Sequence, residues 1–312
     1  MELRQLRYFV AIVDQGSLTR AVNILHIAQP ALSHQLAQLE SELGAKLLLR
    51  SAQGTTPTEA GRIFYQHALS ILKQVDAAKA AVGHSNLEIT GSVTLGMPPG
   101  IAGMLALPIL AALQRSYPVI RLQLSEEMAL TLSDQLKTGR VDLAILFDDG
   151  CMSPFIVTPL IEERIMFIAS PSWLPSAVKA GQISLAEAVQ THLILPTHQQ
   201  GIRPFIDRLI SGSKLIMNHV TSINSFTITR LMLLENIGAT IQHTAPFSAE
   251  LKMGSLVALP ISDTIPYRTV SLCSSRNIPL TNAAIAVQSI VRDTVNDLCG
   301  SGQWLEARGL PS

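Results

Sequence analysis

Apolar residues in the first sixty positions recur at intervals of three and four, which is the spacing of one face of an amphipathic helix. One such stripe covers residues 6–13, and a second covers residues 17–25, where Ser17 is placed to cap the helix. A third covers residues 30–43 and begins at Pro30, which a first helical turn tolerates. The pattern predicts three short helices joined by short turns.

The second and third predicted helices have the spacing of a helix-turn-helix, in which the later helix enters the major groove of DNA. Short and polar side chains at its start can approach base edges closely. An exposed polar face on an ordinary helical hairpin gives the same spacing and stays open as the alternative. The candidates in this part of the chain are Ser17, Gln29, Pro30, Ala31, Ser33 and His34.

A short apolar run at residues 46–50 is followed by a turn-like segment at residues 51–54 and by two threonines before Pro57. This order predicts a small hairpin beside the helices. Basic and polar side chains on such a wing can hold DNA phosphates, which position a protein without carrying sequence information. The candidates for that role are Arg50, Gln53 and Thr56.

Residues 59–88 predict one long helix with an apolar heptad seam, which favours a coiled-coil homodimer. A homodimer would place two recognition helices on successive major grooves. Packing of the seam against the chain's own C-terminal part is the alternative. The predicted seam consists of Phe64, Ala68, Ile71, Val75, Ala78 and Val82.

From residue 89 onward, short β-type segments alternate with helical ones, which indicates parallel sheets covered by helices on both faces. The alternation occurs twice, so two α/β lobes are expected. The predicted strands are residues 92–96, 119–125, 141–147, 163–169, 192–195 and 239–242, and the main predicted helices are residues 101–116, 130–138, 202–210 and 226–236.

Ligands of such folds bind beyond the carboxyl ends of strands, where helix N-termini offer free amides. Segments leading from strands into helices therefore supply the candidates, together with apolar and polar side chains at strand ends. They are Pro98, Pro99, Gly100, Ile101, Phe147, Thr197, His198, Ser222, Asn224, Phe226, Gln242 and His243.

The formal net charge is zero, with 23 basic and 23 acidic residues, so DNA binding must rest on locally placed contacts. Three scattered cysteines have neither metal-site nor disulfide-scaffold spacing. No signal-peptide pattern or apolar run of membrane-spanning length is found, so a cytoplasmic protein without membrane contact is expected. No motif of an enzyme or a metal site is present, and neither catalysis nor a cofactor is expected.

The first sixty residues resemble the LysR-type regulators of bacteria. The similarity is dense in residues 6–10, 16–21, 28–33 and 39–44, and it continues through the wing. Residues 24–30 look most like the nitrogen-assimilation-control branch of that family.

The resemblance implies an α+β protein with a two-lobed α/β effector domain like that of periplasmic solute-binding proteins. Its expected parts are a winged helix-turn-helix at 1–58, a linker helix at 59–88 and the effector domain at 89–312. Lobe 1 would cover about 89–160 and 269–300, and lobe 2 about 161–268.

By this resemblance the chain regulates transcription. Its implied partners are promoter DNA, further copies of itself in a homodimer or homotetramer, a small-molecule effector and RNA polymerase. Relatives often carry hydroxyl groups where this chain has Pro98 to Ile101, which favours a partly apolar effector such as an organic or aromatic acid. Two alternatives stay open: a regulator of this type without an effector, and a solute-binding protein.

Overall fold

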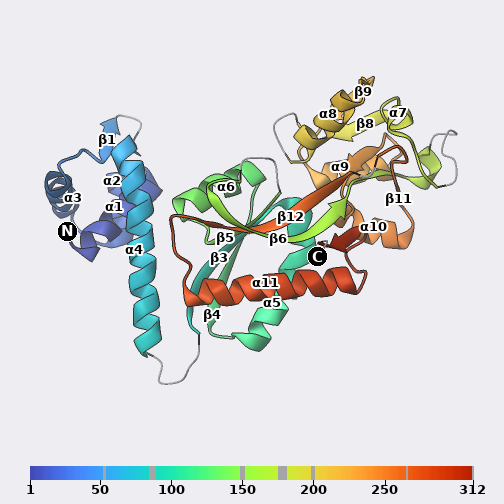
Figure 1. The fold of residues 1–312 in the computed structure, drawn as a ribbon. Coiled ribbons are helices and arrows are strands. Elements are labelled where there is room, and N and C mark those ends of the chain that lie inside the picture. The colour runs from blue at the N-terminus through green and yellow to red at the C-terminus, as the bar shows by residue number, and fades with distance from the viewer. Residues whose placement is uncertain are drawn as a thin grey trace.

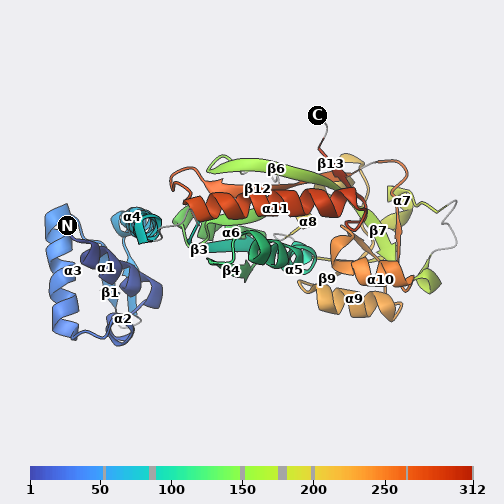
Figure 2. The same ribbon diagram turned by 90° about the horizontal axis from the view of Figure 1, so that it is seen from below.

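A computed structural model describes residues 1–51, 54–83, 89–147, 152–174, 181–197, 201–264 and 266–310 of the chain. The N-terminal head lies at one end of the molecule and the second lobe of the C-terminal domain at the other (Figure 2). The first lobe lies between them. Three groups of buried apolar side chains correspond to the head, the first lobe and the second lobe.

The head contains three helices and a two-stranded wing: α1 (Leu3–Gln15), α2 (Leu18–Leu25), α3 (Gln29–Leu43), β1 (Leu48–Ser51) and β2 (Gly54–Pro57). Ser17 caps α2 by accepting a hydrogen bond from the Arg20 amide, and Pro30 occupies the first turn of α3. Gly16, at a φ of 59°, ends α1 in the left-handed conformation that glycine adopts without strain. The three predicted helices are therefore present, with shifts of a few residues at their ends.

Helix α4 (Glu59–Gly83) continues from the wing and packs its first half against the head (Figure 1). The ring of Phe64 lies edge-on to Phe9 at 5.2 Å, and Ala68 is completely buried in the core of the head. The predicted seam is therefore corrected at Ala68, because this side chain has no surface left for a second chain. Ile71 and Ala78 are exposed and Val75 is half-buried, while the side chain of Val82 lies outside the described part of the structure.

Polar contacts join the head and α4 to the first lobe. Lys73 Nζ lies 2.5 Å from Asp142 Oδ1 and donates to the Gly139 carbonyl oxygen at 2.7 Å. Arg140 donates to the Tyr65 hydroxyl oxygen at 3.2 Å and pairs with Asp14 at 3.3 Å. The first lobe thus contacts both the head and the linker helix of its own chain.

The first lobe contains a six-stranded sheet in the order β13-β6-β12-β5-β3-β4, with α5 and α11 packed against each other on it. Strands β3, β4 and β5 are parallel, whereas β12 is antiparallel to both β5 and β6. The elements are β3 (Gly91–Met97), α5 (Pro99–Ser116), β4 (Ile120–Glu126), α6 (Ala129–Thr138), β5 (Leu143–Phe147), β6 (Phe155–Arg164), β12 (Tyr267–Ser275), α11 (Asn282–Gly300) and β13 (Ala307–Gly309).

The second lobe is built on the antiparallel sheet β10-β7-β11 and the parallel pair β8-β9. Its elements are β7 (Met166–Ala169), η1 (Pro171–Trp173), α7 (Leu185–Ala188), β8 (His192–Leu195), α8 (Arg203–Gly212), β9 (His219–Ser222), α9 (Phe226–Leu234), β10 (Thr240–Gln242), η2 (Ala245–Phe247), α10 (Ser248–Met253) and β11 (Val257–Leu259).

The prediction of purely parallel sheets was wrong, and the strand expected at residues 163–169 is divided between β6 and β7. The reason is the way the chain passes between the lobes. Strand β6 leads out of the first lobe and β12 leads back, so the two run antiparallel beside each other. In the part of the chain that the structure describes, no helix combines the length and apolar character needed to cross a membrane.

Candidate functional site

The start of α3 is exposed on the surface of the head. Gln29, Pro30, Ala31 and His34 are exposed there, while Ser33 is half-buried. Gln38 is also exposed, one turn beyond His34, and was missed by the sequence analysis. The signal was available, because residues four apart lie on the same helix face. Small and amide side chains along this face can reach base edges in a major groove.

The wing packs against α1 and α4 and exposes Arg50 on β1 and Thr56 on β2. The Thr55 amide donates to the Gly16 carbonyl oxygen at 2.9 Å, which ties the wing to the turn between α1 and α2. Ser17 is half-buried as the cap of α2, so its side-chain oxygen already has a backbone partner. Gln53 lies outside the described residues.

Glu40, on the buried side of α3, fixes the strand that enters the wing. Its Oε1 accepts from the Leu47 and Leu48 amides at 2.9 and 3.3 Å, and its Oε2 accepts from Lys46 Nζ at 2.7 Å. Burial acts to raise the pKa of Glu40, but these hydrogen bonds outweigh it and lower the pKa below its ordinary value. The position of the wing relative to α3 therefore depends on one carboxylate.

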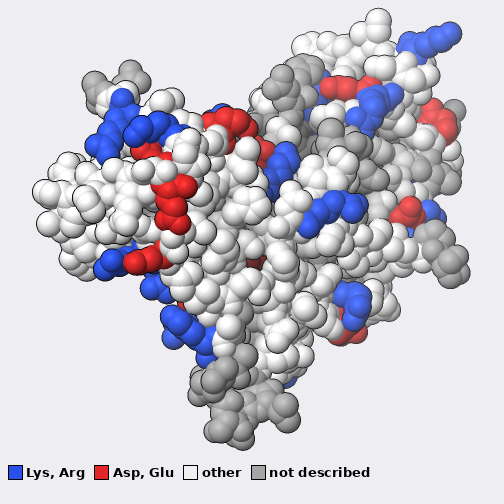
Figure 3. Space-filling model, turned by 60° about the vertical axis from the view of Figure 1, so that its left-hand side comes forward, with Lys and Arg blue, Asp and Glu red and all other residues white. Residues whose placement is uncertain are grey.

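Lys and Arg side chains on the face shown in Figure 3 are scattered among Asp and Glu and form no continuous basic patch. This distribution agrees with the zero formal net charge of the sequence. On this face, affinity for a nucleic acid would come from a few placed contacts and not from a broad positive surface.

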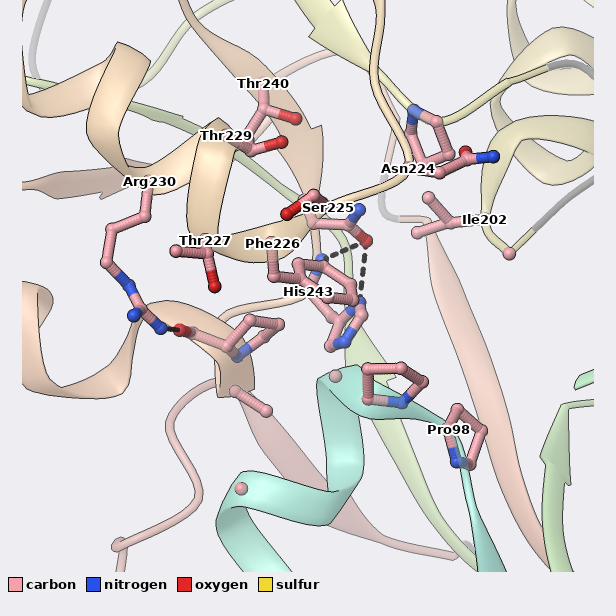
Figure 4. Close-up of a pocket in the computed structure, with 18 of the residues that line it drawn as sticks. Pro98, Ile202, Asn224, Ser225, Phe226, Thr227, Thr229, Arg230, Thr240 and His243 are labelled. Atoms are coloured by element: carbon pink, nitrogen blue, oxygen red, sulfur yellow. Dashed lines mark hydrogen bonds between the residues drawn. The ribbon is translucent and has the colours of Figure 1, made fainter. Parts of the chain in front are cut away.

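A cavity of about 510 Å³ lies between the two lobes (Figure 4). The first lobe contributes the N-terminus of α5 and the carboxyl ends of β4 and β5. The second lobe contributes the N-terminus of α9, the end of β10 and the segment that leads into α10. Of the sequence-predicted residues, the structure brings Pro98, Pro99, Gly100, Phe147, Asn224, Phe226, Gln242 and His243 together on its wall.

Three of the predicted effector residues do not line the cavity. Ile101 is fully buried in the core of the first lobe, because the first turn of α5 directs its side chain inward. Thr197 is bonded to Asn224 Oδ1 through its amide and its hydroxyl, both at 3.0 Å, and supports a lining residue from behind. Ser222 is exposed at the end of β9, away from the cavity, and His198 lies outside the described residues.

His243 forms the floor of the cavity, where α5 and α9 approach each other. It is 3% exposed, and its ring meets Phe226 edge-on at 5.8 Å. Nδ1 lies 2.7 Å from Gln242 Oε1 and 3.2 Å from an Arg268 Nη2, whereas Nε2 has no hydrogen-bond partner. Burial, with a smaller contribution from Arg268, lowers the pKa of His243 to about 4, although Glu163 opposes that shift. The imidazole is therefore neutral at pH 7.

Arg268 and Glu163 form a buried ion pair where β12 and β6 pass between the lobes. Arg268 Nη2 lies 2.5 Å from Glu163 Oε1, and the two residues are 6% and 1% exposed. The guanidinium carbon also lies 3.4 Å from the centre of the Phe147 ring, a cation–π contact. Burial lowers the pKa of Arg268 and Glu163 opposes the shift. Arginine stays protonated at neutral pH, so Arg268 carries its charge inside the protein.

Sequence reasoning missed Arg268, Arg230, Thr229 and Thr240, which also line the cavity. Thr240 and Gln242 share one face of β10 because side chains two apart in a strand point the same way, so the strand pattern held a usable signal for Thr240. Arg268 carried no such signal. It comes from a strand that follows the rest of the lining in sequence and reaches the cavity only through the pairing of β12 with β5 and β6.

An exposed helix beside a wing, joined by a long helix to two lobes around a cavity, defines a DNA-binding regulator with a ligand-binding domain. The family model for the bacterial regulatory helix-turn-helix proteins of the lysR family matches residues 3–62. The model for the LysR substrate binding domain matches residues 87–296.

Relatives and solved structures agree with these matches. The chain is 32% identical over 311 residues to the nitrogen assimilation regulatory protein nac of Escherichia coli (strain K12), covering 97% of this chain and 99% of that protein. It is 34% identical over 242 residues to the protein of the same name from Klebsiella aerogenes, covering 77% and 78%.

The structure of ArgP from Mycobacterium tuberculosis has a similar fold, with a TM-score of 0.74 at 18% identity over 93% of this chain and 96% of that one. A full-length OxyR from Pseudomonas aeruginosa gives a TM-score of 0.73 at 20% identity over 95% of each chain. This chain belongs to the LysR family of bacterial transcription regulators. It is a DNA-binding regulator with a substrate-binding domain for a small-molecule effector. The alternative of a solute-binding protein is set aside, because the family match includes the DNA-binding head.

Proposed function

We propose that this regulator reads its operator with the exposed face at the start of α3, and that a small molecule in the cavity between the lobes controls its action at the promoter. The observation that carries the first part is the exposure of Ala31, His34 and Gln38 on one face of α3, with Gln29 exposed in its first turn. Arg50 and Thr56, on the two strands of the wing, hold phosphates of the operator. The cavity of about 510 Å³ carries the second part, because its volume suits a small organic molecule.

The second copy needed for a two-part operator binds through the exposed stripe of α4. The residues of this stripe are spaced three or four apart, which places them on one side of the helix. They are Ala60, Ile63, His67, Ile71, Gln74 and Ala78. The protein works in the cytoplasm without catalysing a reaction, and RNA polymerase is its further partner at the promoter.

Operator reading is tested with Gln29→Ala. An operator is first selected from a pool of random duplexes with the wild-type protein. The variant should bind that operator about tenfold or more weakly, because a bidentate contact to a base contributes about 1–3 kcal/mol, while its affinity for random duplex stays the same.

Two variants complete the operator experiment. Ser41→Ala, exposed near the other end of α3, is the matched control and should leave both affinities unchanged. Arg50→Ala should weaken both affinities and reduce the salt dependence by about one ion, as expected of a phosphate contact. Equal operator affinity of Gln29→Ala and wild type at matched salt would refute the assignment of α3.

The dimer is tested by light scattering of Ile71→Asp, which places a charge in the middle of the exposed stripe. The variant should dissociate at concentrations at which the wild type is dimeric. Lys79→Asp, exposed on a neighbouring face of α4, is the control. A dimer that persists in Ile71→Asp would place the interface elsewhere.

A further inference from the structure

Both arginines that line the cavity already have a carboxylate partner. Arg268 pairs with Glu163 at 2.5 Å, and Arg230 Nε lies 3.1 Å from Glu250 Oε1. Each pair is close to neutral from a few ångströms away, because the opposite charges nearly cancel at that distance. A negatively charged ligand would therefore find two arginines without a net positive field from either pair.

Glu126, at the carboxyl end of β4, also lines the cavity and is exposed. Among the described residues it forms no ion pair. Glu126 is thus a charged residue of the described lining without a partner of opposite charge. Its carboxylate repels a carboxylate that enters the cavity.

The N-terminus of a helix commonly binds an anion, but at the N-terminus of α5 the free amides are few and a side chain occupies the space. Pro98 and Pro99 have no N–H group, and the Ile101 and Ala102 amides both donate to the Pro98 carbonyl oxygen at 2.9 Å. The remaining amide in the first turn is that of Gly100, the residue against which the His243 ring packs. A methyl group added at Gly100 would be 2.4 Å from His243 Nε2, so the neutral imidazole occupies the space above this helix end (Figure 4).

The hydrogen-bonding groups that remain available belong mostly to the second lobe. Apart from Arg230 Nε and Glu250 Oε2, whose charges pair with each other, they are uncharged. The Phe226 and Thr227 amides form the first turn of α9, where backbone donors have no partner within the helix. Thr240, next to Thr229 on the cavity wall (Figure 4), is 1% exposed, and its Oγ1 has no hydrogen-bond partner. His243 Nε2 is a further buried lining atom without a hydrogen-bond partner. Phe147 and Phe226 supply apolar walls for a flat ring.

We infer that the cavity binds an uncharged aromatic or heteroaromatic molecule through hydrogen bonds to the second lobe, and discriminates against carboxylates. This inference rests on the proposed function of the cavity as the effector site. It replaces the organic or aromatic acid that the sequence led us to expect.

The inference is tested on the full-length protein with matched pairs of probes that differ in one charged group: benzamide and benzoate, and nicotinamide and nicotinate. Thermal shift gives the order of affinity and calorimetry the dissociation constants at pH 7.5. The wild type should bind each amide roughly tenfold or more tightly than its acid, since an unpaired carboxylate beside Glu126 and two neutralised arginines gains little Coulomb energy.

Removing a carboxylate that neutralises an arginine should reverse the selectivity. Glu163→Gln leaves Arg268 unpaired and should shift the ratio of acid to amide affinity about tenfold toward the acid. Glu250→Gln should do the same through Arg230 and serves if the buried Glu163→Gln protein does not fold. Glu162→Gln is the matched control, because this neighbour on β6 pairs with Arg308 and does not line the cavity.

The outcomes separate the inference from the proposed function. Amide-selective binding by the wild type and a shift toward the acid in Glu163→Gln or Glu250→Gln support the inference. Wild-type binding of the acids as tightly as the amides overturns it while leaving the cavity as an effector site. Binding of no probe by any variant, with operator affinity intact, overturns both.

Discussion

Two buried carboxylates, Glu40 in the head and Glu163 between the lobes, are satisfied in different ways. Glu40 accepts hydrogen bonds at both oxygens from Lys46, Leu47 and Leu48, all within eight residues along the chain. Glu163 is held by Arg268, 105 residues away, and its Oε2 has no partner. The first arrangement is complete and local, so it fixes a surface in place. The second is incomplete and depends on tertiary structure, as is common at sites that bind or move.

The largest effect is expected from Arg268→Ala, which leaves the Glu163 charge buried without its partner. Removing one member of a buried pair destabilises proteins by about 3–5 kcal/mol. Urea denaturation of the full-length protein should show this loss in the transition of the C-terminal domain, with the head unaffected. A loss below about 1 kcal/mol would mean that water already reaches Glu163, and the contrast with Glu40 would then disappear.

Acid should also destabilise the region between the lobes, through His243. The folded protein holds the pKa of His243 near 4, whereas the unfolded chain has the ordinary value of 6.5. Unfolding therefore takes up a proton between these values, so stability is complete above about pH 6.5 and decreases as the pH falls toward 4.

The expected loss is on the order of 3 kcal/mol over this range, from the difference between the two pKa values. It is measured by urea denaturation as the difference in unfolding free energy between wild type and His243→Gln at each pH. This difference cancels the contribution of all other titrating groups. Parallel curves for the two proteins would show that His243 is not held neutral by burial.

In the head, Glu40→Gln should lower the stability by about 2 kcal/mol, because hydrogen bonds to a charged group contribute about 1.5–3 kcal/mol each and the amide preserves part of them. The wing should also lose its fixed position against α3. Operator affinity should therefore fall by more than the increase in unfolded protein alone would cause. Glu42→Gln, exposed on the same helix, is the control. Equal operator affinities of the two variants would show that Glu40 does not position the wing.

The smallest effect is expected at a third carboxylate, Asp14, which is partly exposed. Its pair with Arg140 joins the head to the first lobe, with the two side chains 40% and 50% exposed. Solvent screens such a pair, so Arg140→Ala should cost less than about 1 kcal/mol, and less again at high salt. A loss of stability as large as that of Arg268→Ala would show that water is excluded from the contact between the head and the first lobe.

The head was largely readable from the sequence because its determinants are close together along the chain. Leu32, Leu36 and Leu39 mark the buried side of α3 by spacing alone, and their exposed neighbours follow from the same period. The wing followed from its turn residues. Glu40 was not recognised, because a buried acid inside a helix stripe reveals its role only when its acceptor atoms meet the strand that follows.

Only part of the cavity lining could be predicted from the sequence. Segments between strands and helices supplied five of its residues and strand ends three, since the ends of parallel strands meet at one edge of a sheet. Ile101 was misplaced because the direction of a side chain in the first helical turn depends on the register of α5. The mixed order of the first sheet was missed because pairing between β12 and β6 joins residues about 105 apart.

The sequence by itself determined the class of this protein: the helices of the head, the long linker helix and the alternation of two α/β lobes follow from local periodicity and from family resemblance. Tertiary structure decided which atoms face the cavity and how their charges combine. The position of His243 over Gly100 and the pairing of Arg268 with Glu163 both depend on contacts between distant segments. For that reason the charge preference of the cavity could be inferred only once the strands between the lobes were in place.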